Sequence, residues 1–159
     1  MKFGTDGIRG FANQELTATL AMKIGTALAS TFTPEENHKV VIGKDTRISG
    51  DMLVSALIAG LCSSGIDIIN LGIIPTPAVS YLTEKYKASA GIAVSASHNP
   101  SEYNGIKIFN SAGYKLSDDL EHIIEDKIND PNFAVSAKKV GQILSDYHPI
   151  EDYVNHLLS

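Results

Sequence analysis

Tryptophan is absent from this chain of 159 residues, and cysteine occurs only once, at Cys62. A single cysteine excludes an internal disulfide, so the apolar core must hold the fold together. Cys62 lies in an apolar helical stretch, and we interpret it as a core residue rather than a nucleophile. No apolar run approaches the length of a membrane span, and the amino-terminal segment lacks the apolar stretch of a signal peptide. We therefore expect a cytoplasmic protein with no membrane partner.

Positive charge is also scarce, because 18 acidic residues outnumber 13 basic ones and leave a net charge of -5. Because the sequence has no basic cluster with interleaved aromatic residues, we expect no nucleic-acid partner. The hydrophobic fraction of 43% and the charged fraction of 19% are typical of a soluble globular protein. The length suits one domain with one core. Four histidines are scattered without the spacing of zinc or iron ligands, namely His38, His122, His148 and His156.

Helical and strand-like apolar patterns alternate along the first 95 residues. The spacing predicts helices over 17–32, 51–64 and 75–86, with Ser49 near the start of the second, and strands over 40–42, 66–71 and 90–95. This alternation predicts a mostly parallel sheet with helices on both faces. Functional groups of such sheets gather in loops at the carboxyl ends of strands. The loop after Ser95 is therefore the first place to look for a site.

Residues 105–110 break the alternation, because they form a predicted strand only a short loop after the previous one. Such a short connection allows only an antiparallel pair, so we expect a hairpin over 90–110 in a mixed, mostly parallel α/β sheet. A further helix is predicted over 117–128.

The sequence pattern near the carboxyl terminus predicts a domain boundary after residue 147. We expect residues 1–147 to form one α/β/α domain and residues 148–159 to form a helix leading toward a second domain. That helix begins at Pro149 and reaches Ser159 without a cap, and its apolar face has no assigned partner. Two copies of the chain could pair through this face as a homodimer.

The stretch from 95 to 107 places hydroxyl, imidazole, amide and ammonium groups in one strand–loop–strand unit. If the hairpin is symmetric about Ser101, Ser97 faces Gly105. Lys107 is then a diagonal neighbour of Ser97, with about 7–8 Å between their Cα atoms. A lysine reaches that far, and a cation beside a serine hydroxyl suits a serine that carries or accepts a phosphoryl group.

Two other interpretations of this loop stay open. The Ser-His-Asn-Pro sequence at 97–100 is also typical of an ordinary turn, because Ser and Asn bond the local backbone and Pro fixes the bend. A Ser-His-Asp hydrolase is the other competitor. Against it, Ser97 and His98 are sequence neighbours whose side chains point apart, and the Gly-x-Ser-x-Gly motif is absent.

An earlier segment, Phe-Gly-Thr-Asp-Gly-Ile-Arg-Gly at 3–10, contains three glycines and predicts a tightly bent backbone. It lacks the full Walker pattern of nucleotide-binding loops. Its Arg9 either clamps a phosphate with two N–H groups or is a solvated turn residue.

A further segment, Gly-Lys-Asp-Thr-Arg-Ile-Ser-Gly at 43–50, lies between a predicted strand and a predicted helix. That position suits anion binding at a helix amino terminus. We favour a structural role instead, in which Asp45, Arg47 and Ser49 pair with one another and cap the helix locally.

Together, the segments at 3–10, 43–50 and 95–107 resemble bacterial phosphoglucosamine mutases of the α-D-phosphohexomutase superfamily. Their order and spacing match as well, so the resemblance covers essentially the whole chain and implies the amino-terminal domain of such an enzyme. It implies that a phosphoryl group on Ser97 passes to the sugar, giving a bisphosphosugar that reorients and returns its other phosphate to the serine.

The resemblance also assigns roles to neighbouring residues. His98 and Lys107 would assist proton transfer and charge stabilisation, and Lys107 would also contact phosphate. Arg9 would support the transferring phosphate, and Asn99 would shape the loop and contact the ligand. Magnesium would bind the phosphate on Ser97, and a bisphosphosugar would act as activator.

The implied reaction interconverts glucosamine 6-phosphate and glucosamine 1-phosphate, on the route to UDP-N-acetylglucosamine and the cell wall. The metal, sugar-specificity and phosphate-binding loops of the family lie in domains II–IV and do not occur here. We therefore expect the chain to need those domains as partners, and to be inactive on a phosphosugar substrate by itself. Ala96 and the 3–10 segment favour the glucosamine branch. A phosphomannomutase or phosphoglucomutase, and a non-catalytic interaction module, remain the alternatives.

Overall fold

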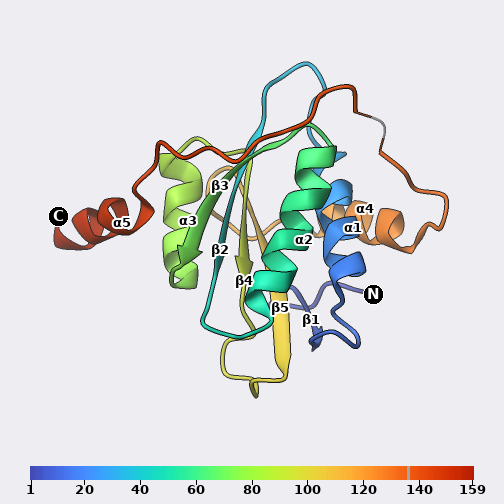
Figure 1. The fold of residues 1–159 in the computed structure, drawn as a ribbon, viewed down its shortest axis with the longest axis horizontal. Helices are drawn as coiled ribbons and strands as arrows, with labels where there is room; N and C mark the ends of the chain where they lie inside the picture. The colour runs from blue at the N-terminus through green and yellow to red at the C-terminus, as the bar shows by residue number, and fades with distance from the viewer. Residues whose placement is uncertain (136) are drawn as a thin grey trace.

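One five-stranded sheet organises the computed structural model, which describes residues 1–135 and 137–159 (Figure 1). Its strands, in the spatial order β1-β5-β4-β2-β3, are β1 (Ile8–Phe11), β2 (Lys39–Lys44), β3 (Asp67–Ile73), β4 (Ala90–Val94) and β5 (Tyr103–Asn110). Strand β2 pairs in parallel with β3 and β4, whereas β5 runs antiparallel to β4 and β1. The mixed sheet and its hairpin confirm the expected fold, and β1 adds an antiparallel edge that the sequence pattern did not predict.

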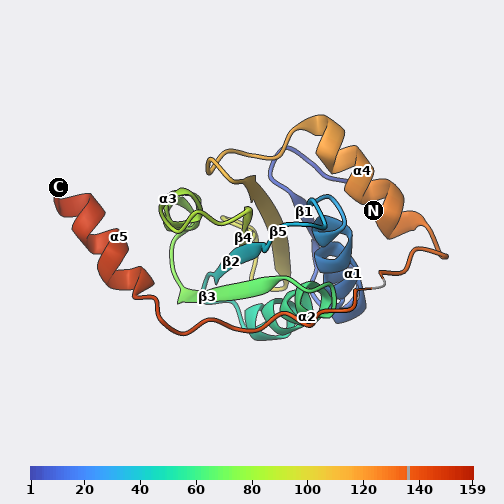
Figure 2. The same cartoon turned by 90° about the horizontal axis from the view of Figure 1, so that it is seen from above.

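Five helices accompany the sheet in the described part of the chain, and each lies within a few residues of its predicted range. They are α1 (Ala18–Ala29), α2 (Gly50–Ser63), α3 (Thr76–Lys85), α4 (Asp118–Asn129) and α5 (Pro149–Leu158). Helices α1 and α2 cover one face of the sheet and α3 covers the other (Figure 2). Thr17 and Ser117 begin α1 and α4 as caps, because their hydroxyls accept hydrogen bonds from backbone N–H groups in the first turn.

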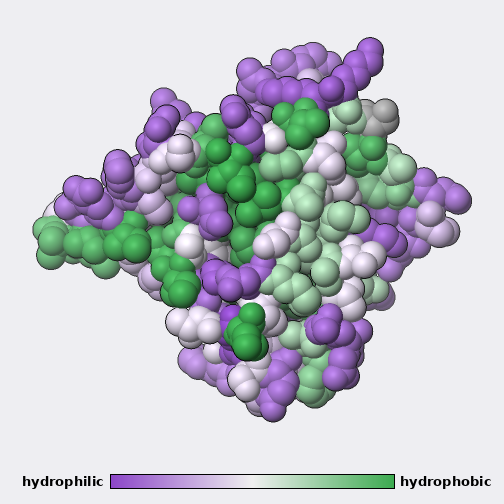
Figure 3. All heavy atoms as spheres, in the orientation of Figure 1, coloured by the Kyte–Doolittle hydropathy of each residue, from purple (hydrophilic) through white to green (hydrophobic). Residues whose placement is uncertain are grey.

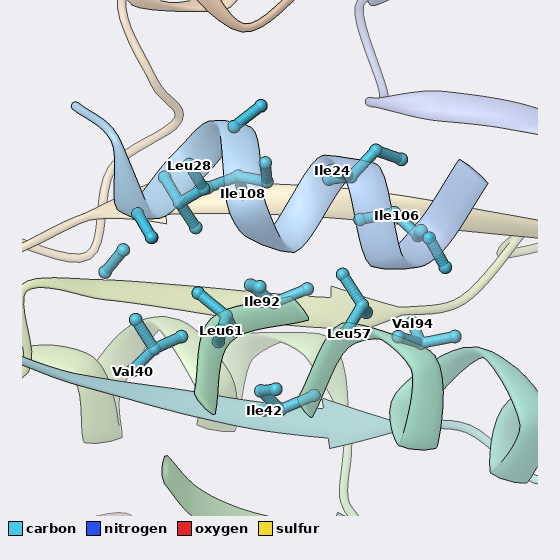
Figure 4. Close-up of a cluster of buried hydrophobic side chains, with 14 of the residues drawn as sticks. Ile24, Leu28, Val40, Ile42, Leu57, Leu61, Ile92, Val94, Ile106 and Ile108 are labelled. Atoms are coloured by element: carbon cyan, nitrogen blue, oxygen red, sulfur yellow. The ribbon is translucent and has the colours of Figure 1, made fainter. Parts of the chain in front are cut away.

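The larger core fills the space between the sheet and helices α1 and α2 (Figure 4). Aliphatic side chains of three adjacent strands face those of the two helices, namely Val40, Ile42, Ile92, Val94, Ile106 and Ile108 against Ile24, Leu28, Leu57 and Leu61. Alternate strand residues such as Val41 and Ala93 enter the second core beneath α3. Burial on both faces explains why β2 and β4 are almost uniformly apolar. Their parallel pairing brings their carboxyl ends to the same edge of the sheet.

Helix α5 begins at Pro149, as predicted, and contacts α3 through few residues. The Tyr81 ring stacks on His156 with 3.8 Å between ring centroids, and the Tyr86 hydroxyl donates a hydrogen bond to Asp152. Apolar side chains of α5 remain exposed in the hydrophobic area at the left of Figure 3, namely Ile150, Val154, Leu157 and Leu158. No helix in the described residues is long and apolar enough to cross a membrane.

Candidate functional site

The site forms where the carboxyl ends of β2 and β4 meet at one edge of the sheet. The backbone N–H of Asp45, just after β2, donates to the carbonyl of Val94 at the end of β4, at 3.1 Å. The loop at 45–49 therefore lies beside the loop at 95–102, which connects β4 to β5 (Figure 1). This is the edge at which the sequence predicted a site.

The hairpin register differs from the expected one by two residues. A hairpin symmetric about Ser101 would place Lys107 opposite Ser95, but Lys107 pairs with Ala93, and the Ser95 N–H donates to the carbonyl of Gly105 at 2.9 Å. The expected register assumed that both strands continue to the middle of the loop. Instead the chain turns away at Ser97, whose φ of 55° is left-handed and whose N–H donates to the Ser95 hydroxyl at 3.1 Å.

Lys107 nevertheless contacts Ser97 through its side chain. The Lys107 ammonium donates a hydrogen bond to Oγ of Ser97 at 3.0 Å. Ser97 is exposed, and a left-handed conformation is uncommon for a residue other than glycine. Such backbone conformations cluster at functional sites, and a hydrogen bond from a cation favours a negatively charged serine derivative.

Arg9 lies on the same face of the sheet, because β1 pairs it with Gly105, two residues from Lys107 on β5. A Cβ at position 105 would lie 3.1 Å from Cγ of Arg9 and 2.6 Å from the carbonyl oxygen of Ser95. Glycine at 105 thus makes room for the arginine. Arg9 forms an ion pair with Asp6 at 3.3 Å, and its Nε is buried without a hydrogen-bond partner among the described residues. An unpaired buried donor of this kind needs an explanation, such as a ligand or a water molecule.

His98 and Asn99 follow Ser97 in the loop but differ in their surroundings. His98 is exposed, and its imidazole forms no hydrogen bond within the part of the chain described. Asn99 is half-buried, and its backbone N–H donates to the carbonyl of Ala96 at 3.1 Å. The structure therefore places Ser97 and Lys107 in contact, and His98 beside them.

Arg47 links the two loops. Its Nε and its backbone N–H both donate to the Asp45 carboxylate, at 3.1 and 3.0 Å, which confirms the predicted local pairing. The sequence did not reveal its other contacts, because they join segments about fifty positions apart. The guanidinium also donates to four backbone carbonyl oxygens, those of Ser97, Asn99 and Pro100 in the neighbouring loop and that of Tyr103 at the start of β5.

Asn104 is the second residue whose role the sequence did not reveal. It is fully buried at the start of β5, and its Nδ2 donates to the Ser49 hydroxyl at 2.8 Å. Ser49 occupies the position before α2, as predicted, but its hydroxyl accepts this bond instead of capping the helix. A strongly polar residue within an apolar strand was the available signal, since buried polar groups need partners.

A cavity of about 230 Å³ lies beside Lys107, between β5, the amino-terminal segment and the start of α3. Lys115 also lines it, but its ammonium is paired with the nearly buried Glu121 at 2.7 Å, and that hydrogen bond raises the pKa of Lys115. Among the described residues, Lys107 forms no ion pair of this kind. Its charge therefore remains available to an anionic ligand beside the serine.

A resident metal ion does not fit the described residues. They include no group of three or more His, Cys, Asp or Glu side chains that could hold one. Magnesium requires about six oxygen ligands, and a phosphate on Ser97 would supply only part of that set. Burial, together with the charge of Asp67, raises the pKa of the Cys62 thiol, which supports a core role for that cysteine.

Most of the chain matches a known protein family. The model of "phosphoglucomutase/phosphomannomutase, alpha/beta/alpha domain I" matches residues 1–135. Phosphoglucosamine mutases of Acetivibrio thermocellus and Clostridioides difficile are each 54% identical to the chain over 99% of its length. The chain spans 36% of the length of each of these relatives.

Solved structures agree with the fold. A phosphoglucomutase/phosphomannomutase family protein from Burkholderia thailandensis superposes with a TM-score of 0.83 and 28% identity, over 98% of this chain and 35% of that one. A putative phosphomannomutase from Thermus thermophilus gives a TM-score of 0.77 and 29% identity, over 91% of this chain and 33% of that one.

Proposed function

Because the chain belongs to the phosphoglucomutase/phosphomannomutase family, we propose that it forms the phosphoserine-bearing domain of a phosphoglucosamine mutase. Ser97 carries the phosphoryl group that is exchanged with the sugar. The observation that supports this role most directly is the hydrogen bond from Lys107 to the hydroxyl of an exposed serine held in a left-handed conformation. The substrate is a hexose phosphate, and the 54% identity to phosphoglucosamine mutases favours glucosamine 6-phosphate over mannose or glucose phosphates.

In the proposed transfer, a sugar hydroxyl attacks the phosphorus on Ser97. The new bond joins the sugar oxygen to phosphorus, the bond between phosphorus and Oγ of Ser97 breaks, and the proton of the sugar hydroxyl passes to a base, for which exposed His98 is the candidate. The Lys107 ammonium, 3.0 Å from Oγ, stabilises the charge that develops on the departing serine oxygen. Arg9, whose side chain is partly exposed on the same face of the sheet, binds the phosphoryl oxygens through its guanidinium. The return transfer reverses these steps.

The remaining parts of the site are proposed to come from the domains that the longer relatives carry. The described residues cannot enclose Mg²⁺ by themselves, so no step is derived through that ion. Magnesium, a bisphosphosugar activator and the sugar-reading residues all belong to this proposal. On these grounds residues 1–159 alone are proposed to be inactive, and multiple turnover by this chain, free of contaminating enzyme, would contradict that part of the proposal.

A chimera tests the function directly. Residues 1–159 would be joined to the remaining domains of the Acetivibrio thermocellus phosphoglucosamine mutase and assayed with glucosamine 6-phosphate, Mg²⁺ and a bisphosphosugar. We expect glucosamine 1-phosphate to form, and Ser97→Ala to lower kcat by about 10³-fold or more, as expected for loss of a nucleophile. Ser101→Ala, in the same exposed loop, is the matched control and should stay active. Full activity of Ser97→Ala would overturn the proposal.

A further inference from the structure

The side chain of Arg47 uses every N–H donor that it has. A guanidinium carries five N–H groups. Nε donates to Asp45, and the remaining four donate to backbone carbonyls. Those distances are 2.6 and 3.0 Å from Nη1 to Pro100 and Tyr103, and 3.1 and 2.8 Å from Nη2 to Ser97 and Asn99. The side chain is only 10% exposed, so these bonds are largely shielded from water.

The chain contains only one other arginine, Arg9, which differs from Arg47 in this respect. Arg9 keeps a buried Nε without a partner among the described residues, whereas Arg47 has no donor left for a ligand. Arg47 therefore does not bind phosphate in this arrangement, although its segment follows a strand and precedes a helix. Its bonds all serve the backbone that carries Ser97 and the carboxylate of Asp45.

We infer that Arg47 is a positioning residue for phosphoryl transfer, which holds the Ser97 loop in its reactive conformation. This inference rests on the proposed function of Ser97. Arg47 binds the carbonyl of the left-handed residue itself and that of Asn99, two residues later. Fixing these peptide groups fixes the Cα–Cβ bond of Ser97, and this keeps Oγ within reach of the Lys107 ammonium.

The guanidinium is itself anchored at the end of the sheet. Asp45 accepts from both the backbone N–H and the Nε of Arg47, and the Asp45 N–H donates to the carbonyl of Val94. The loop is thus tied to the last residue of β4 through two routes, its own chain and the Asp45–Arg47 pair. Both routes end on a strand that is buried on both faces, which gives the loop a rigid support.

Lysine cannot replace arginine in this arrangement. An ammonium offers three donors around a single point, whereas the four carbonyl oxygens are reached by the two arms of a planar fork. Arg47→Lys keeps the charge and loses most of the bonds. A purely electrostatic role would survive this substitution, but a positioning role would not.

The kinetic test uses the same chimera. We expect Arg47→Lys and Arg47→Ala to lower kcat by about 10²-fold, the effect of a small misplacement of a reacting group, with KM changed less than about threefold. Methylguanidinium should restore part of kcat in Arg47→Ala and none in Arg47→Lys. Lys44→Met is the matched control, because it breaks the neighbouring ion pair with Asp51, and among the described residues the Lys44 ammonium forms no hydrogen bond with the loop at 95–102. Asp45→Asn weakens only the Asp45–Arg47 pair and should give a smaller fall in kcat. This variant provides the test if the Arg47 variants do not fold.

A second readout separates this inference from the proposed function. In residues 1–159, hydrogen exchange of the Ser97 and Asn99 amides should be about tenfold or more faster in Arg47→Lys, while amides of β2 and β4 keep their wild-type rates. Failure of Ser97→Ala to affect the chimera would reject the proposed function, whereas the exchange rates would still report on Arg47. Unchanged exchange and kcat in Arg47→Lys would overturn the inference. So would a rise in KM at constant kcat, which would instead make Arg47 a ligand-binding residue.

Discussion

The ammonium of Lys107 lies 3.0 Å from Oγ of Ser97, although the backbone pairing places Lys107 opposite Ala93. The contact arises because the loop leaves the hairpin early and turns at Ser97, whose φ is 55°. The turn that displaces the register is therefore also the feature that presents the serine hydroxyl to the lysine. One residue supplies both the bend and the proposed acceptor of the phosphoryl group.

Replacing Lys107 with methionine tests the charge at this contact. In the chimera, the phosphoryl-transfer rate should fall by about 10²–10³-fold, because one donor to the developing oxyanion is lost. The melting temperature should change little, since the ammonium bonds an exposed hydroxyl. Lys23→Met removes an exposed lysine of α1 and is the matched control. Equal rates in the Lys107 and Lys23 variants would show that the contact does not contribute to transfer.

Two glycines with left-handed backbones offer a matched pair for stability. Gly7 and Gly72 have φ of 88° and 71°, but a Cβ at position 7 would lie 2.2 Å from the carbonyl oxygen of Ile106, whereas position 72 is open. Gly72→Ala should cost about 1–2 kcal/mol from backbone strain alone. Gly7→Ala should cost clearly more, because β1 must also move away from β5. Urea unfolding of residues 1–159 measures both, and equal losses would contradict this account of Gly7.

The bond between Asn104 and Ser49 should behave as a coupled pair. Ser49→Ala leaves the buried Nδ2 of Asn104 without its acceptor, so the free energy of unfolding should fall by about 1–3 kcal/mol. Asn104→Ala removes this bond and also the acceptor of the Gly105 N–H. A double-mutant cycle should give a coupling energy of about 0.5–1.5 kcal/mol. Strictly additive effects would mean that the two side chains do not interact in solution.

The contact between α5 and α3 should weaken in alkaline solution. Burial, and then the hydrogen bond to Asp152, raise the pKa of Tyr86 above its ordinary value of 10.0. A raised tyrosine pKa means that the folded state holds the proton more tightly. The contribution of this contact to stability is therefore fully present below pH 10.0 and is lost as the pH rises through the higher pKa of the folded state.

Ring resonances of His156, which stacks on Tyr81 of α3, provide the measurement. They should shift toward undocked values as the pH is raised above 10.0 in the wild type. Tyr86→Phe lacks the titrating hydroxyl and should show partial undocking at neutral pH, with little further change in alkali. Identical titration curves for the two proteins would assign the transition to another group.

Apolar spacing along the chain was sufficient to predict the helices and the central strands. The stripe of Leu20, Ile24 and Leu28 marks one face of α1, and the run at 40–42 marks a strand buried on both sides. Strand β1 was missed because its four residues carry a glycine and little periodicity, and its pairing with β5 depends on a partner far along the chain.

The site shows the same division between local and distant contacts. Ser97 and Lys107 could be brought together from the sequence, because they belong to one hairpin. The contacts of Arg47 with the loop and of Asn104 with Ser49 could not be predicted. Each joins the segment after β2 to the β4–β5 hairpin, and the approach of these segments depends on the packing of β2 beside β4. The predicted register of the β4–β5 hairpin was wrong for a related reason, because no pattern of residue types predicts a serine in the left-handed conformation.

The pairing of β1 with β5 joins the first strand of the sheet to the last. During synthesis, the segment bearing Arg9 must wait for β5 to emerge before it can enter the sheet, because it has no other strand as a neighbour. Pairings between distant segments form late and limit the folding rate. Arg9 and the loop that carries Ser97 therefore come together only when β1 pairs with β5. A chain in which β1 has not yet paired with β5 therefore presents Ser97 without Arg9, so the proposed transfer depends on completion of this edge of the sheet.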